Sequence, residues 1–219
     1  MGFIRQEMPL ETLLGRYLVA ESRVLNVGSK ARRVWPNSVN LDLVAGENVD
    51  VVGDAHDLPF PESSYDACVL YAMLQYCERP WRVVDEVSRV LKPGGLAFVD
   101  VPFLQPYCAE TAAFDRFRFT KAGLEGLFSA DYDLEESGVT IATGSVLAQL
   151  GRATADTWIR NRYVSYLLRQ SATLAFWPVG ALRFAARPET AGGFYLVARR
   201  RPALAQAAAD SPRAVTATP

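Results

Sequence analysis

The sequence predicts one doubly wound α/β domain built on a mostly parallel sheet. Its 219 residues suit a single domain with additions, and half of them are hydrophobic, so the chain can bury a substantial core. From residue 10 onward, short apolar runs alternate with stretches of helical periodicity, which is typical of a parallel sheet covered by helices. Ligands bind such sheets at the carboxyl ends of the strands, so the residues that follow each strand are the candidate site residues.

The first seventy residues contain one predicted helix and four predicted strands. An amphipathic helix that ends near Ala20 is predicted by five apolar side chains at helical spacing: Leu10, Leu13, Leu14, Tyr17 and Leu18. The apolar runs that follow predict strands at 23–27, 39–43, 50–53 and 65–70.

The rest of the domain alternates in the same way. Residues 79–91 have helical periodicity, and the segment KPGG at 92–95 predicts a turn, because proline cannot continue a helix and glycine tolerates a positive φ. A helix is predicted over 120–128, with Thr120 as its N-cap. The remaining strands are predicted at 96–101, 139–142 and 193–198. The domain therefore covers residues 1–202, and the low-complexity tail 203–219 is expected to be disordered.

A helical insertion is predicted at about 152–187, where arginines alternate with large apolar side chains. Pro178 divides this segment, so we expect two short helices rather than one. We expect them to form a lid packed on the sheet, with arginine side chains that extend to solvent. The alternative is a surface that docks on an anionic membrane or holds an anionic acceptor.

The net charge of -1 conceals a division of charge along the chain. Residues 1–150 carry a net charge of -8, whereas residues 151–201 carry +7. We expect no nucleic-acid partner, because the sheet-forming part is acidic, while the basic part leaves an anionic partner open.

The cysteine and histidine content excludes several kinds of site. Three cysteines without metal-ligand spacing and one histidine, His56, argue against a disulfide framework, a metal site and a Ser-His-Asp triad. The N-terminus lacks the apolar core of a signal peptide, and no stretch has the length and apolarity of a transmembrane helix. We therefore expect a cytoplasmic protein.

Three successive strands end on residues that suit a nucleoside ligand. The first runs into Gly28, where a glycine turn lets the backbone approach a ligand and can aim amide groups at it. The second ends at Asp42, whose carboxylate can accept from both hydroxyls of a ribose. The third ends at Asp54, which can accept from an adenine amino group or cap its own loop. Because no phosphate-binding lysine motif accompanies them, the pattern predicts an adenosine-type ligand without phosphates.

The segments VLNVGS, VNLDL, VVGDAHDLPFPESSYDACVLYAMLQY and VSRVLKPGGLAFVDVPF together resemble the class I S-adenosylmethionine-dependent methyltransferases. The chain is most similar to a small bacterial branch, whose Phe-Leu-Gln and Arg-Phe-Thr segments match residues 103–105 and 118–120. The resemblance implies a Rossmann-like sheet of seven strands, in which the last, at 194–198, is antiparallel. It also implies S-adenosylmethionine as the cofactor.

The resemblance assigns a cofactor role to eight residues: Asn26, Gly28, Ser29, Asp42, Leu43, Asp54, Ala55 and Tyr71. In the family, an acidic residue usually stands where this chain has Asn26, and glycines stand where it has Lys30 and Arg32. The altered turn loses a charged contact to the cofactor's ammonium group, so we expect weakened cofactor binding. Relatives also often carry a Glu-His pair at 75–76, and this chain does not.

The residues that would face the acceptor follow the fourth and fifth strands. We interpret Tyr76, Tyr107 and Arg118 as acceptor-binding candidates, and Tyr76 and Asp115 as candidate bases. Packing of Tyr107 and a salt bridge of Asp115 are the structural alternatives. The predicted function is in-line methyl transfer to a small or carbohydrate- or lipid-linked acceptor. A non-catalytic binding or scaffold protein of the same fold is the alternative, and a nicotinamide-dependent oxidoreductase is less favoured, since the three-glycine pyrophosphate turn is missing.

Overall fold

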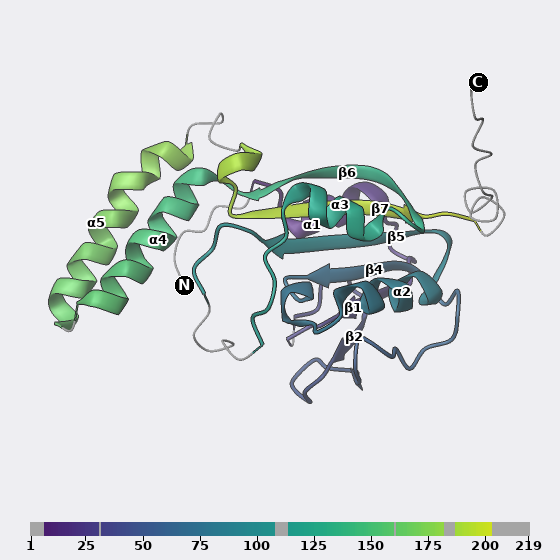
Figure 1. The fold of residues 1–219 in the computed structure, drawn as a ribbon. Coiled ribbons are helices and arrows are strands. Elements are labelled where there is room, and N and C mark those ends of the chain that lie inside the picture. Colours follow the sequence, from purple (N-terminus) through teal and green to yellow (C-terminus); the bar gives the residue numbers. More distant parts are fainter. Residues whose placement is uncertain (1–6, 31, 108–113, 160, 182–186, 203–219) are drawn as a thin grey trace, which may run out of the picture.

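A seven-stranded sheet with strand order β3-β2-β1-β4-β5-β7-β6 forms the centre of the computed structural model (Figure 1). The structure describes residues 7–30, 32–107, 114–159, 161–181 and 187–202. The strands are β1 (Val24–Val27), β2 (Val39–Asp42), β3 (Val51–Val52), β4 (Tyr65–Tyr71), β5 (Leu91–Pro102), β6 (Tyr132–Ile141) and β7 (Gly193–Arg200). The strand β7 runs antiparallel to both of its neighbours, β5 and β6, and the other six strands share one direction, so the predicted Rossmann-like architecture with an antiparallel last strand is confirmed.

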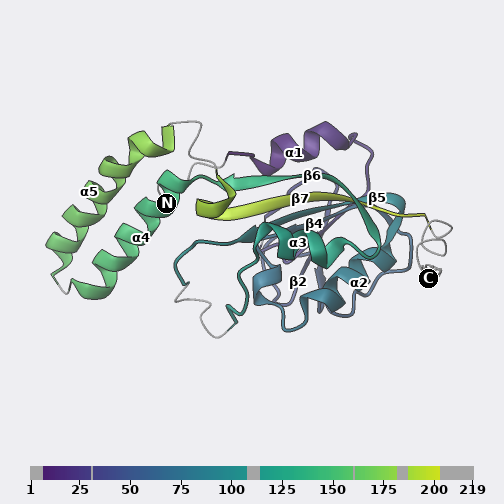
Figure 2. The same ribbon diagram turned by 45° about the horizontal axis from the view of Figure 1, so that its top comes forward.

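Helices cover both faces of the sheet, because alternate residues along each strand point to opposite sides. The helix α1 (Leu10–Tyr17) packs on one face, where its leucines meet Leu96 and Phe98 of β5. The helices α2 (Pro80–Val90) and α3 (Lys121–Phe128) pack on the other face, against Ala97 and Val99 (Figure 2). Two short 3-10 helices, η1 (Leu74–Tyr76) and η4 (Pro188–Thr190), lie in the connections. The predicted N-cap of α3 is confirmed, since the Thr120 hydroxyl accepts from the Gly123 amide at 3.0 Å.

The predicted turn at 92–95 is instead a bulge inside β5. The strand begins at Leu91, directly after α2, and Leu91 pairs with Tyr65 of β4. The next pair in register is Ala67 with Leu96, so four residues of β5 are accommodated where β4 supplies one. Gly94 takes a positive φ of 79° within the bulge. The glycines therefore serve a kink in a strand, which keeps its pairing on both sides.

The strand β6 begins seven residues earlier than the sequence predicts. After the buried Tyr132, residues 133–136 include three acidic residues, which hides the strand from a search for apolar runs. They are polar because β6 is the edge of the sheet, where Asp133 and Glu135 pair with Arg201 and Arg199 next to them.

The predicted helical insertion is a hairpin of two helices, α4 (Thr143–Trp158) and α5 (Arg162–Ala181). The prediction of a lid packed on the sheet is wrong: the two helices pack on each other and project beyond the sheet in both views (Figures 1 and 2). The helix α5 continues through Pro178, so the division at that residue is also wrong. The break lies instead before α5, where the Asn161 side chain accepts from the amides of Tyr163 and Val164.

Among the described residues, no helix has the length and apolar character required to cross a bilayer. The predicted disordered tail, 203–219, lies outside the described residues.

Candidate functional site

Two adjoining cavities open at the carboxyl ends of the central parallel strands. The first has a volume of about 190 Å³ and is lined by Gly28, Lys30, Leu41, Asp42, Leu43, Gly53, Asp54, Ala55, His56, Ala72, Met73, Tyr76 and Cys77. The second has a volume of about 330 Å³ and is lined by Asn26, Gly28, Ser29, Lys30, Arg32, Val34, Tyr71, Ala72 and Tyr76. All eight residues that the sequence assigns to the cofactor line one or both cavities. They come from the ends of β1, β2, β3 and β4, as the doubly wound fold requires.

Gly28 forms the floor that the two cavities share. Its φ is +72°, and a Cβ at this position would lie 2.7 Å from the Met73 Cβ, so the turn requires glycine. The amides of Gly28 and Ser29 both donate to the Leu41 carbonyl, at 2.8 and 3.1 Å. The expectation that this turn aims those amides at the ligand is therefore wrong. The Ser29 side chain is different: its hydroxyl is buried, has no hydrogen-bond partner among the described residues and lines the second cavity.

Asp42 ends β2 and lines the first cavity. One carboxylate oxygen accepts from the Lys30 amide at 2.8 Å, and the other accepts from the Val44 amide at 3.2 Å. These bonds fix the carboxylate between the turn after β1 and the turn after β2. Each oxygen keeps a further lone pair, so the group can still accept hydroxyl hydrogens from a ligand. Leu43, next along the chain, is 70% exposed and forms an apolar rim of the same cavity.

Asp54 caps its own loop as well as lining the first cavity. Its Oδ1 accepts from the His56 amide at 2.9 Å and lies 2.7 Å from His56 Nδ1. The bond from the His56 amide, with help from the imidazole, holds the pKa of the Asp54 carboxyl below its usual value. The other ring nitrogen of His56 accepts from the Arg79 amide at 3.3 Å. Both nitrogens of this imidazole are thus engaged within the loop, which favours a structural role for His56.

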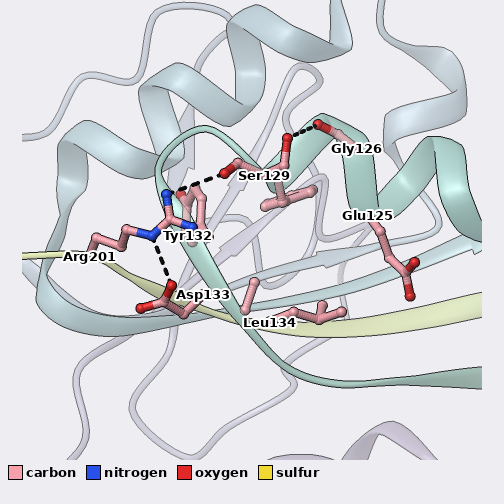
Figure 3. A pocket seen from close by; sticks show the side chains of 9 residues that line it. Glu125, Gly126, Ser129, Tyr132, Asp133, Leu134 and Arg201 are labelled. Atoms are coloured by element: carbon pink, nitrogen blue, oxygen red, sulfur yellow. Dashed lines mark hydrogen bonds and ion pairs between the residues drawn. The ribbon is translucent and has the colours of Figure 1, made fainter. Parts of the chain in front are cut away.

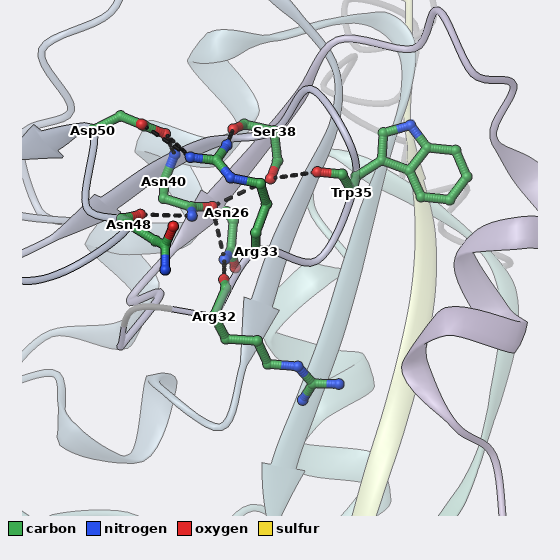
Figure 4. Close-up of polar contacts among 8 residues, drawn as sticks. All are labelled: Asn26, Arg32, Arg33, Trp35, Ser38, Asn40, Asn48 and Asp50. Atoms are coloured by element: carbon green, nitrogen blue, oxygen red, sulfur yellow. Dashed lines mark hydrogen bonds and ion pairs between the residues drawn. The ribbon is translucent and has the colours of Figure 1, made fainter.

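Asn26 anchors a polar network beneath the second cavity (Figure 4). Its amide nitrogen donates to the Arg32 carbonyl at 2.7 Å and to Asn40 Oδ1 at 3.1 Å. Asn40 in turn donates to the Asn48 carbonyl and accepts from the Ser38 hydroxyl. An acidic side chain at position 26 could make neither donation. The asparagine at position 26, where the family usually has an acidic residue, is therefore matched by two neighbouring acceptors that require a donor there.

Lys30 and Arg32, the residues that replace family glycines, contribute side chains to the site. The Lys30 ammonium lies 5.4 Å from the ring centroid of Tyr76, and the Arg32 guanidinium lies 4.8 Å from that of Tyr71. Lys30 has a positive φ of 43°. The sequence reveals these positions as departures from a pattern, but their place in the cavity follows only from the fold.

Of the candidate acceptor residues and bases, Tyr76 belongs to the lining of the two cavities, and Tyr107, Asp115 and Arg118 do not. Tyr76 lines both cavities at their junction. Tyr107 is 62% exposed. The Asp115 side chain is 2% exposed and forms a two-point ion pair with Arg118, which raises the pKa of that guanidinium. This is the salt bridge that the sequence leaves open as the structural alternative for Asp115. The amides of Arg116 and Phe117 donate to the Gln75 carbonyl and hold this segment against η1.

The sequence does not point to Asp100, which lies at the carboxyl end of β5 beside Tyr71 of β4. Burial raises the pKa of its carboxyl to about 6, although the Arg32 guanidinium nearby opposes the shift. In the sequence, Asp100 is a single charged residue within the apolar run 96–101. That exception is the one signal that could have pointed to it. Met73 and Cys77 are likewise cavity residues that look like ordinary core residues in the sequence.

A third cavity, of about 340 Å³, lies between α3 and the start of β6 (Figure 3). Some of its polar groups bond to one another: Arg201 pairs with Asp133 at 2.8 Å and donates to the Ser129 carbonyl at 3.3 Å. The start of β6 is at the amino ends of the parallel strands, so this cavity is remote from the first two. We assign it no role.

Comparison with known proteins shows which proteins this chain is similar to. Residues 25–99 match the family model described as a methyltransferase domain. The 27-O-demethylrifamycin SV methyltransferase of Amycolatopsis mediterranei is 28% identical over 158 residues, which are 68% of this chain and 57% of that protein. The chain spans less than two thirds of the length of the curated relatives it matches.

Solved structures share the fold at low sequence identity. Phosphoethanolamine N-methyltransferase 2 of Haemonchus contortus, bound to S-adenosylhomocysteine, superposes with a TM-score of 0.57 at 13% identity, covering 88% of this chain and 52% of that one. The [4+2]-cyclase SpnF superposes with a TM-score of 0.55 at 19% identity, covering 88% and 80%. The chain thus carries a match to the methyltransferase domain over residues 25–99 and shares the fold of these solved structures.

Proposed function

We propose that this protein transfers a methyl group from S-adenosylmethionine to a small or carbohydrate- or lipid-linked acceptor. The observation that carries the proposal is the convergence of Gly28, Asp42 and Asp54-Ala55 on one cavity at the carboxyl ends of β1, β2 and β3. A glycine floor, a hydroxyl-binding carboxylate and an apolar rim at Leu43 are the features that an adenosine group needs.

The second cavity fits the amino-acid end of the same cofactor. Within the part of the chain that the structure describes, the buried Ser29 hydroxyl has no hydrogen-bond partner, and it can bond to a ligand there. Arg32 and Lys30 supply positive charge for a carboxylate, while the Asn26 carbonyl oxygen can accept from an ammonium group, since both its amide hydrogens are donated elsewhere. The bound cofactor would supply a methyl group on a sulfonium centre, ready for in-line displacement.

The main role of the protein's side chains in this reaction would be to position the cofactor and the acceptor. The fixed carboxylate of Asp42 and the constrained turn at Gly28 would orient the ligand before the acceptor arrives. Tyr76 stands at the junction of the two cavities, where it can exclude water and, through its hydroxyl, accept or relay an acceptor proton. Asp115 is less suited to take that proton, because both of its oxygens are paired with Arg118.

A non-catalytic binding protein of the same fold is the second candidate. The observation that favours it is the positive charge of Lys30 and Arg32 beside a cavity that would hold a cationic cofactor. Titration with S-adenosylmethionine and S-adenosylhomocysteine separates the two candidates. Binding of both ligands supports the enzyme, whereas binding of neither at millimolar concentration supports the scaffold.

Substitution of Asp42 tests the site assignment. We expect Asp42→Asn to weaken S-adenosylhomocysteine binding by about tenfold or more in titration calorimetry, because a hydrogen bond to a charged group contributes roughly 1.5–3 kcal/mol. The matched control is Asp85→Asn, which neutralises an exposed carboxylate on α2. Equal affinities for the Asp42 variant and the wild type would remove Asp42 from the site.

A further inference from the structure

The hairpin of α4 and α5 carries a concentration of exposed apolar side chains. Of the seventeen large hydrophobic residues exposed in the described part of the chain, eight lie between positions 150 and 174. They are Leu150, Trp158, Tyr163, Val164, Tyr166, Leu167, Leu168 and Leu174. Apolar surface gathered in this way is costly in water, so it indicates a surface that something else covers.

Small and polar residues fill the contact between the two helices. A Cβ on Gly151 would lie 2.9 Å from the Ala172 Cβ, so the helices approach closely there. Ser165 is 7% exposed, and its hydroxyl donates to the Asp156 carboxylate at 3.0 Å; Arg169 pairs with the same carboxylate at 3.4 Å. A hairpin that folds in water places its large apolar residues inside. Among the side chains that the structure describes, this hairpin reverses that order, and small residues inside with large apolar residues outside are typical of helices packed in lipid.

The side chains at the tip suit the interface between lipid and water. Trp158 ends α4 and is 81% exposed, and Tyr163 and Tyr166 lie in the first turns of α5. Tryptophan and tyrosine favour the headgroup region, where an apolar ring and a polar group are both accommodated. Residues 143–187 contain six arginines and one acidic residue, Asp156. This excess of positive charge complements anionic headgroups.

We propose that the α4–α5 hairpin docks on the surface of an anionic phospholipid bilayer, with its tip inserted among the headgroups. The chain leaves the sheet for the hairpin at Ile141 and returns to it at Gly193. Both residues lie at the end of the sheet where the parallel strands have their carboxyl ends and the two cavities open. Docking of the hairpin therefore brings this end of the sheet toward the membrane (Figure 1). Access to a lipid-linked acceptor would follow, and only that consequence rests on the proposed function.

Flotation of the full chain with vesicles tests the proposal. We expect the protein to float with vesicles of phosphatidylglycerol and phosphatidylcholine, and to float much less with phosphatidylcholine alone or at high salt. The triple substitution Trp158→Ser, Tyr166→Ser and Leu167→Ser should lower the partition coefficient by about tenfold or more, since burial of one large apolar side chain contributes about that factor. The matched control is Trp81→Ser, which removes an exposed tryptophan from α2 and should leave flotation unchanged.

Two results would overturn the proposal. One is absence of binding to anionic vesicles, or equal binding by the triple variant, with circular dichroism showing both proteins folded. The other is a wild-type dimer in light scattering that the triple variant converts to a monomer, without vesicle binding by either; the hairpin would then be a contact between two copies. S-adenosylhomocysteine titration of the same samples separates these results from a failure of the proposed cofactor site.

Discussion

Two non-glycine residues that line both cavities, Lys30 and Ala72, have left-handed backbone conformations, with φ of 43° and 50°. Such conformations cost free energy in residues with a Cβ, and they persist where the surrounding structure enforces them. The Lys30 amide is held by Asp42, and the Ala72 amide donates to the Asp100 carbonyl at 2.9 Å. The family preference for glycine at position 30 is thus explained by backbone geometry. In this chain a lysine takes the left-handed conformation at a cost in free energy, and it places a cation in the site.

A pair of substitutions at Lys30 separates its backbone from its charge. Lys30→Ala removes the ammonium group but leaves a Cβ in the left-handed conformation, whereas Lys30→Gly removes the ammonium group and the Cβ that makes this conformation costly. We expect the glycine variant to have a free energy of unfolding about 1 kcal/mol higher than the alanine variant. Urea denaturation measures both values. Equal stabilities would mean that the left-handed conformation at position 30 carries no strain.

The buried carboxyl of Asp100 predicts a dependence of stability on pH. Its folded-state pKa of about 6 lies above the ordinary value of 3.8, so the fold disfavours the ionised form. The protein therefore loses stability through this group as pH rises from about 4 to about 6, and gains none back above that range. We expect Asp100→Asn to be more stable than the wild type at pH 7, by up to about 3 kcal/mol, and equally stable near pH 3.5. A difference that stays constant across this range in denaturant titrations would contradict the account.

At the scale of elements, the sequence predicts best where a local rule is sufficient. The cap at Thr120 is one example, because a threonine before a helical run accepts from an amide three residues later. The strands β1 and β4 are another, since they are buried along most of their length and consist mainly of apolar residues. The bulge at 92–95 and the early start of β6 depend on the neighbouring strands, which no local pattern records.

The N-cap of α3 provides an element-scale prediction. Thr120→Ala removes the acceptor for the Gly123 amide and should lower the free energy of unfolding by about 1 kcal/mol, while Thr120→Ser keeps the acceptor and should change it little. Thermal unfolding of the three proteins gives the comparison. Loss of equal size in both variants would assign the effect to the threonine methyl group instead.

The candidate site was predictable to the extent that it follows strand ends. Gly28, Asp42 and Asp54 lie at or just after the carboxyl ends of three strands, so their meeting at one end of the sheet follows from the parallel topology. The pairing of Lys30 with Tyr76, and of Asp115 with Arg118, joins turns and loops whose paths the strand pattern does not determine. The roles of Tyr107 and Arg118 toward an acceptor remain predictions.

At the scale of the whole molecule, the division of charge corresponds to a division in space. Residues 1–150, whose net charge is negative, supply six of the seven strands and all the residues that line the two cavities. Residues 151–201, whose net charge is positive, supply most of the projecting hairpin and the antiparallel strand β7. The near-neutral total charge therefore describes neither part, and the hairpin is the part of the molecule suited to an anionic surface.

The central claim is that the two cavities together hold S-adenosylmethionine. A crystal structure of the full chain with S-adenosylhomocysteine tests it most directly. We expect the ribose hydroxyls at Asp42, the adenine beside Asp54-Ala55 and Leu43, and the amino-acid end near Ser29 and Arg32. Density for the ligand elsewhere on the molecule, or none in crystals soaked at millimolar concentration, would contradict the claim.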